Sequence, residues 1–161
     1  MNWEELFKLQ MGLDKKIVEQ HNLQGKSLVS EKILALQVEL GELANETRCF
    51  KYWSTKKPSS KEIILEEYVD CIHFLLSLGL EFHYTDIPIK ICALDSKITE
   101  QFINIYIDLN DFTICSSKDN YLTLFEDLLC LGTALDFSEE DIFNHYCKKN
   151  DVNHERQASD Y

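Results

Sequence analysis

Hydrophobic residues recur every three or four positions along most of the chain, a period that predicts amphipathic α-helices. In the first half this pattern predicts a helix from Trp3 to about Gln20, a second from an N-cap at Ser30 to about Arg48, and a third from about Lys61 to Glu81. The segment from Phe50 to Ser60 is aromatic and basic and contains a proline. It is predicted to be the loop between the second and third helices.

The second half continues the helical period. A helix start is predicted at Asp86, and further helices over Leu94 to Ile107 and over Tyr121 to Leu135. The residues Ile103 to Ile107 alternate as in a strand, but no second run of this kind could pair with them, so they are assigned to a helix. Ser138 is expected to cap a final helix.

Composition favours an all-α fold. The 161 residues include only five Gly and two Pro, which favours long helices over strands and turns, and no shift in composition divides the chain. Residues 1–161 are therefore predicted to form a single domain, a helical bundle. Cys71, Cys92 and Cys130 lie in apolar helical runs without CxxC spacing, which indicates reduced thiols and a cytoplasmic protein.

The formal charge of −12 argues against a nucleic-acid partner, because binding to phosphates needs Lys and Arg gathered on one face. No apolar stretch reaches the roughly 20 residues that cross a membrane, so no membrane partner is expected. An acidic protein still binds a polyanion when divalent cations lie between the two. A polyanionic ligand held through metal ions is therefore compatible with this charge.

Two pairs of carboxylates have the i, i+3 spacing that places both members on one helical face: Glu39 with Glu42, and Glu67 with Asp70. At 100° per residue, Glu67 falls on the apolar stripe of its helix, whereas Glu66 points outward. A buried carboxylate without a partner is costly. Glu67 and Asp70 therefore require a cation or a hydrogen-bonded network.

If the two helices face each other, the four carboxylates converge, and Glu46 continues the row on the second helix. Like charges at close range repel strongly, so this arrangement requires hard cations, and carboxylate ligands suit Mg²⁺ or Mn²⁺. The alternative is a salt-bridge network in which Arg48 and Lys51 neutralise part of the charge.

Gln10 lies centrally on the apolar face of the first helix, with Asp14 one turn later. A buried amide needs partners, and its donor and acceptor match the N3–H and carbonyl groups of uracil. Trp53 in the aromatic loop offers a stacking surface. The alternative is a core Gln satisfied by its neighbours. His73 follows Asp70 at the spacing of a di-iron ligand but without a second copy, so a supporting or surface histidine is expected.

Five blocks of residues occur in a fixed order along the chain: Leu6-Phe7-x-x-Gln10-x-x-Leu13-Asp14, Glu39-x-x-Glu42, Arg48-Cys-Phe50-Lys51-Tyr-Trp53, Glu67-x-x-Asp70-x-x-His73-Phe74 and Lys149-Asn150-x-x-Asn153-x-x-Arg156-Gln157. Together they resemble the dimeric all-α dUTPases of firmicutes and their phages, which are related to MazG-type pyrophosphatases. The segment from Ile87 to about Phe143 matches only as generic helix. The tail departs from the family pattern, because Asp160 rather than Gly precedes Tyr161.

The resemblance implies an intertwined homodimer with the fold of the all-α NTP pyrophosphatases. It implies hydrolysis of dUTP, and with it dUDP as a further candidate substrate, by a metal-activated water that yields dUMP and pyrophosphate from dUTP. The implied Mg²⁺ ligands are Glu39, Glu42, Glu67 and Asp70. The implied substrate-binding residues are Gln10, Asp14 and Trp53 at the uracil and Lys51, Lys149, Asn153, Arg156 and Tyr161 toward the phosphates.

Several points stay open at the level of sequence. Glu42 and Glu46 are both candidates for the general base. The polar segment 148–161 is expected to close over the substrate. Two other functions compete with dUTP hydrolysis: a MazG-like pyrophosphatase for another nucleotide, and a non-catalytic helical module that binds proteins. The resemblance to phage enzymes also leaves room for a regulatory protein partner.

Overall fold

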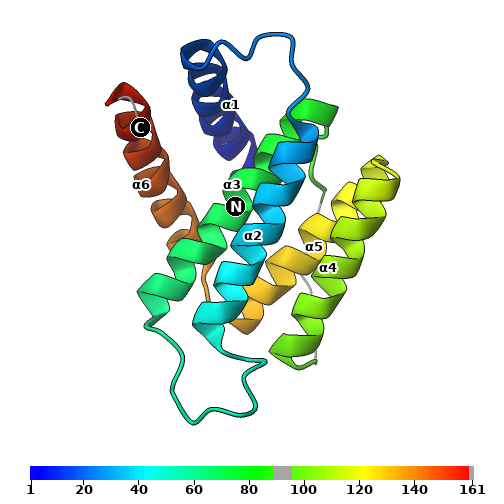
Figure 1. Cartoon of the computed structure of the whole chain (residues 1–161), viewed down its shortest axis with the longest axis vertical. Helices are drawn as coiled ribbons and strands as arrows, with labels where there is room; N and C mark the ends of the chain where they lie inside the picture. Colours follow the sequence, from blue (N-terminus) through cyan, green and yellow to red (C-terminus); the bar gives the residue numbers. More distant parts are fainter. Residues whose placement is uncertain (89–95, 160–161) are drawn as a thin grey trace.

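The computed structural model describes residues 1–88 and 96–159, which form six helices and no strand (Figure 1). The helices are, in chain order, α1 (Trp3–Gln20), α2 (Val29–Thr47), α3 (Lys61–Phe82), α4 (Ile98–Ile114), α5 (Lys118–Ala134) and α6 (Glu139–Ala158). The predicted all-α class is confirmed.

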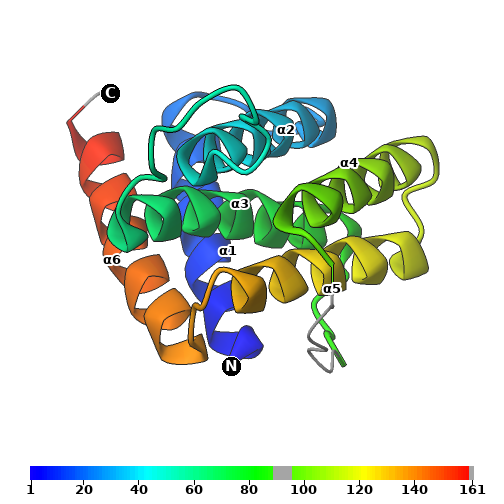
Figure 2. The ribbon, with the colours of Figure 1, turned by 90° about the horizontal axis from the view of Figure 1, so that it is seen from below.

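Helix α3 is the central element of the fold. It packs against α1, α2, α5 and α6, while α4 contacts α2 and α5 (Figures 1 and 2). Helices α1 and α6 lie side by side and cross α3 (Figure 2). Every residue of α3 from Leu75 to Gly79 is buried, as expected for a helix covered on all sides.

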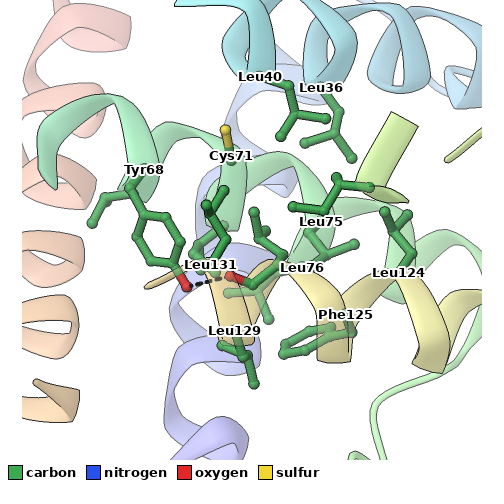
Figure 3. Close-up of a cluster of buried hydrophobic side chains, with 14 of the residues drawn as sticks. Leu36, Leu40, Tyr68, Cys71, Leu75, Leu76, Leu124, Phe125, Leu129 and Leu131 are labelled. Carbon is green, nitrogen blue, oxygen red and sulfur yellow. Dashed lines mark hydrogen bonds between the residues drawn. The ribbon is translucent and has the colours of Figure 1, made fainter. Parts of the chain in front are cut away.

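The core combines leucines from several helices with tyrosines that keep their hydroxyl groups hydrogen bonded. The Tyr68 hydroxyl donates to the Leu128 carbonyl oxygen at 3.1 Å, a bond between α3 and α5 that is drawn in Figure 3. The Tyr121 hydroxyl donates to the Leu75 carbonyl at 3.0 Å. Because both hydroxyls are buried, these bonds remove the cost of taking them out of water.

The helix bounds agree closely with the predicted ones in the first half. Helix α1 has the predicted ends, and α3 ends one residue later than predicted. The predicted cap was wrong: Ser30 lies inside α2, and Leu28 is the N-cap residue, without a side-chain hydrogen bond. Arg48 ends α2 in the left-handed conformation with φ 57°, and the chain then forms the predicted loop.

The second half needs two corrections. Residues 86–88 are not helical, and any helix after the predicted start at Asp86 would fall in 89–95, outside the described residues. The predicted start of the next helix, Leu94, lies outside the described residues, and residues 96 and 97 are not helical. Helix α4 begins at Ile98 and continues to Ile114, past the predicted end, and the residues Ile103 to Ile107 are helical as predicted. The prediction for the last helix is confirmed, because Ser138 and Asp141 form a reciprocal capping box.

Cys71 and Cys130 are buried, free thiols, as predicted. Cys92 lies outside the described residues. None of the helices in the described part of the chain is long and apolar enough to span a bilayer.

The contact between α3 and α5 gives a first testable prediction. A Cβ at Gly132 would overlap the Tyr68 side chain, so Gly132→Ala should lower the free energy of unfolding by about 2 kcal/mol, the usual cost of overpacking. A Cβ at the helical Gly12 meets no atom within 4 Å, so Gly12→Ala should instead stabilise the protein by up to about 1 kcal/mol. Urea denaturation measures both. Equal effects of the two substitutions would contradict the assignment of this contact.

Candidate metal and nucleotide site

Three carboxylates from two neighbouring helices converge on one point. Glu39 comes from α2, and Glu67 and Asp70 come from α3 at the predicted i, i+3 spacing. Each offers one oxygen, and these oxygens lie within 4.8 Å of one another. All three residues are partly buried. We call these three residues the carboxylate cluster.

The electrostatics of the cluster show that its negative charges are poorly compensated. Burial and the charges of Asp70, Glu42 and Glu67 raise the pKa of Glu39 to about 7, against an ordinary value of 4.5. The pKa of Glu67 is raised by burial and by Asp70, and that of Asp70 mainly by burial. Such shifts mean that the ionised forms are destabilised in the folded protein.

Of the described lysines, Lys149 forms an ion pair with the cluster. The Lys149 ammonium on α6 lies 2.7 Å from the Asp70 carboxylate and 2.9 Å from that of Glu66. Glu66 is exposed, as the helical wheel predicted. The sequence suggested Arg48 as a partner for the carboxylates, but Arg48 donates to Ser54 and to the Lys56 carbonyl instead.

The other two acidic residues of α2 lie differently. Glu42 is exposed and is not part of the cluster, yet its charge raises the pKa of Glu39 and Glu67. Glu46 accepts a hydrogen bond from the Ser59 hydroxyl, and its carbonyl accepts the Ser59 N–H at 3.1 Å. Glu46 therefore holds the end of the loop, at Ser59, against the last turn of α2.

Gln10 is buried in a hydrogen-bonded network between α1, α3 and α6. Its Oε1 accepts from His73 Nδ1 at 2.9 Å and from the Tyr146 hydroxyl at 2.7 Å, and its Nε2 donates to Asp14 Oδ1 at 2.7 Å. The Asp14 carboxylate also accepts from the Ser77 hydroxyl at 2.5 Å. Of the two alternatives expected for His73, the supporting one is what the structure shows, because His73 is buried and bonds to Gln10.

A cavity of about 200 Å³ joins the Gln10 network to the carboxylate cluster. Its wall includes Gln10 and His73 of the network together with Asp70, a member of the cluster. The remaining wall residues come from α1, α3 and α6: Leu13, Ile17, Phe74, Ser77, Asn153, Arg156 and Gln157. A single ligand could therefore contact an amide donor and the metal-binding candidates together.

The aromatic loop lies apart from this cavity. The Trp53 side chain is 65% exposed and packs edge-on against Phe50 and Tyr52, and Lys51 extends over the Phe50 ring. No residue of this loop is in the cavity wall. The structure therefore does not bring Lys51 or Trp53 to Gln10.

The predicted face of the last helix is present, because α6 continues to Ala158. Lys149 lies at the carboxylate cluster, and Asn153 and Arg156 line the cavity. Lys149 and Arg156 also line a second cavity of about 260 Å³ between α3 and α6. Tyr161 lies outside the described residues.

Sequence reasoning missed Tyr146 and Ser77, which complete the Gln10 network, and it missed Lys149 as the partner of Asp70. Tyr146 lies in the period of an apolar helical face, where it resembles any core aromatic residue. Lys149 and Asp70 are far apart in the sequence, so no local pattern connects them. Only the crossing of α6 over α3 could have revealed both.

A family model described as dUTPase matches residues 2–161 of the chain. None of the curated proteins compared with the chain matches it. The match covers nearly the entire sequence, and it selects one of the functions that the sequence left open. The chain belongs to the all-α dUTPase family, whose members are nucleoside triphosphate pyrophosphatases that hydrolyse dUTP.

Proposed function

We propose that the chain hydrolyses dUTP to dUMP and pyrophosphate at the carboxylate cluster, with Mg²⁺ as the cation. The observation that carries this proposal is the convergence of Glu39, Glu67 and Asp70 beside a cavity with an amide in its wall. We extend the proposal to dUDP, because this nucleotide would still place its base in the cavity and its two phosphates at the carboxylate cluster.

The donor set fits a hard divalent cation. Three carboxylate oxygens within 4.8 Å of one another are the ligand type that Mg²⁺ and Mn²⁺ prefer, and water completes such sites. The pKa values of Glu39, Glu67 and Asp70 are raised, so a bound cation would stabilise their ionised forms. We assign Glu42 as a fourth ligand, since its charge raises the pKa of Glu39 and Glu67. When bound, the cation lowers the pKa of the attacking water and neutralises charge on the phosphates.

The chain's own residues hold the reactants. Lys149 fixes Asp70 through their ion pair, and with Asn153 and Arg156 it presents a polar face that suits phosphate oxygens. Of the two candidates for the general base, Glu46 is engaged by Ser59. We favour Glu42, through the carboxylate oxygen that the cation leaves free, because its charge acts on the cluster whereas the Glu46 carboxylate holds the loop.

The base of the nucleotide is assigned to the cavity beside Gln10 and Asp14. Trp53 and Lys51 enter the proposal only through movement of the loop between α2 and α3, because the loop is absent from the cavity wall. The C-terminal segment 148–161, including Tyr161, is assigned to closing over the bound nucleotide. Lys149 and Arg156 support this assignment by their place beside the cluster and the cavity.

The first test of the site uses a metal-dependent assay with one substitution. Wild-type protein should release pyrophosphate from dUTP with Mg²⁺ but not with EDTA, and faster than from dCTP or dTTP. Glu67→Gln keeps the side-chain size but removes a charge from the cluster, so turnover should fall at least about 100-fold, as when one charge-stabilising group of a catalytic site is lost.

Glu62→Gln is the matched control, because Glu62 lies on the same helix and is exposed. This variant should retain activity within about twofold of wild type. Circular dichroism should show the same helical content for both variants. Near-normal turnover by Glu67→Gln would remove Glu67 from the metal site.

The raised pKa of Glu39 predicts how stability depends on pH. Between about pH 4.5 and 7 the folded protein retains the Glu39 proton that the unfolded chain has lost. Folded protein therefore binds more protons, and the free energy of unfolding falls as the pH rises through this window. Because Glu39 is half exposed, solvent screening reduces the effect to roughly 1 kcal/mol.

Urea denaturation in EDTA at several pH values measures this dependence. Glu39→Gln should be more stable than wild type at pH 8 and should lose less stability between pH 5 and 8. Mg²⁺ should restore stability to wild type at pH 8 but not to the variant. Parallel pH curves for the two proteins would show that Glu39 is not destabilised by its neighbours.

A homodimer is the last part of the proposal. Helices α2 and α4 each expose an apolar pair at i, i+4 spacing, Leu34 with Val38 and Ile103 with Ile107. The two helices are joined by Tyr106, whose hydroxyl donates to the Gln37 carbonyl oxygen at 3.2 Å. A gathering of apolar side chains on a surface is typical of an interface, and we assign this face to a second copy of the chain.

The dimer proposal is tested by the mass in solution. Wild-type protein should sediment at twice the chain mass, and Ile107→Glu should shift it to the monomer, because a charge would be buried at the interface. Ile114→Glu serves as the control, since Ile114 is 77% exposed at the end of α4. Monomeric wild-type protein at micromolar concentration would refute the assignment.

A further inference from the structure

The Lys149 ammonium neutralises part of the carboxylate cluster from within the protein. Its Nζ lies 2.7 Å from Asp70 Oδ2, and both side chains are largely buried, with exposed fractions of 15% and 17%. Burial raises the pKa of every carboxyl group in the cluster, and the charge of Lys149 opposes that rise. The charge of this ammonium therefore acts on the whole cluster and not on Asp70 alone.

A divalent cation at the cluster would act on the same negative charges. Cations of this kind bind carboxylate oxygens at about 2.1 Å, so even on the opposite oxygen of Asp70 the cation would lie no more than about 7 Å from the Lys149 ammonium. Two positive charges repel each other at that distance, most of all in a partly buried site. The ammonium and the cation therefore compete for the charge of the cluster.

Glu66 offers the ammonium a second position. Its Oε1 lies 2.9 Å from Lys149 Nζ, one helical turn before Asp70 on α3. Glu66 is exposed and is not a member of the cluster. A buried ammonium without a partner is costly. Because Glu66 is already in contact with it, Lys149 can give up Asp70 and still keep a carboxylate partner.

We propose that Lys149 is the internal counter-ion of the carboxylate cluster, and that a divalent cation displaces it from Asp70 to Glu66. This inference rests on the proposed function, which places a cation at the cluster. Lys149 thus fixes Asp70 only until the cation binds, and it lowers the affinity of the protein for free metal ions. The displaced ammonium remains on α6, on the face that carries Asn153 and Arg156 and is assigned to the phosphates.

The affinity for Mn²⁺ without nucleotide, measured by electron paramagnetic resonance, separates competition from the opposite role, in which Lys149 orients Asp70 for the cation. Lys149→Met keeps most of the side-chain length but removes the charge. The variant should bind Mn²⁺ at least about 10-fold more tightly than wild type, as expected when a like charge roughly 6 Å away is removed. Lys149→Arg keeps the charge and should bind Mn²⁺ as wild type does.

Lys148→Met is the control for a charge lost from the same helix. Lys148 is exposed, so solvent screens its charge, and the variant should bind Mn²⁺ within about twofold of wild type. Circular dichroism should show the same helical content for all variants. Unchanged or weaker binding by Lys149→Met would overturn the competition. Failure of both wild type and Lys149→Met to bind Mn²⁺ would instead overturn the proposed metal site.

A double-mutant cycle tests the second position, at Glu66. In Glu66→Gln the ammonium loses its alternative partner and stays on Asp70, so Mn²⁺ should bind more weakly than to wild type. In the Lys149→Met background the same substitution should have a smaller effect, because no ammonium is left to move. Equal effects of Glu66→Gln in the two backgrounds would show that the ammonium does not move to Glu66.

Acetylation of the unmodified protein covers the case in which a variant does not fold. Lys149 and Lys148 differ in burial, and mass spectrometry follows both in one sample without nucleotide. Mg²⁺ should speed the acetylation of Lys149, because an amine held by one carboxylate instead of two is more accessible to the reagent, and should leave that of Lys148 unchanged. A rate at Lys149 that Mg²⁺ leaves unchanged or lowers would refute the proposal.

Discussion

The constraint on which the site depends is that α3 is both the most buried helix and the carrier of two acidic side chains. Its Leu75 to Gly79 segment is buried among its neighbours, and in the N-terminal half of the same helix Glu67 and Asp70 lie beside Glu39 of α2. The core contacts hold these like charges close together although, in addition to burial, Asp70 and Glu67 raise the pKa of Glu39 and Asp70 raises that of Glu67. The apolar core thus stabilises an arrangement that electrostatics alone would disperse.

The two sides of the cavity differ in how well their polar groups are satisfied. At the carboxylate cluster Lys149 forms an ion pair with one of the three carboxylates, so the site retains negative charge. At Gln10 nearly every hydrogen bond is already made within the protein. The cluster is therefore defined by unbalanced charge, whereas the amide network is defined by hydrogen bonds that the protein itself satisfies.

The local parts of this site could be predicted from the sequence, and the contacts between distant segments could not. The helical period alone placed Glu67 toward the interior and Glu66 outward, because a wheel needs only neighbouring residues. The same pattern recognised Gln10 as buried but could not supply its partners, since Tyr146 lies on another helix. The N-cap was also missed: Ser30 fits the local preference for a capping residue, but α2 begins one residue before it, at Val29.

Helix α6 links the two sides of the cavity through its register. Tyr146, Lys149 and Asn153 follow one another at intervals of three and four residues, so one face reaches the amide network, the cluster and the cavity in turn. Two hydrogen bonds connect the end of this helix to α1 and the residue that follows it: the Lys16 ammonium donates to the His154 carbonyl oxygen, and the His21 ring bonds to the Gln157 side chain. A shift of one residue would rotate the face by 100° and break all these contacts at once, so the position of the Lys149–Asp70 ion pair and that of the Gln10 amide are set together.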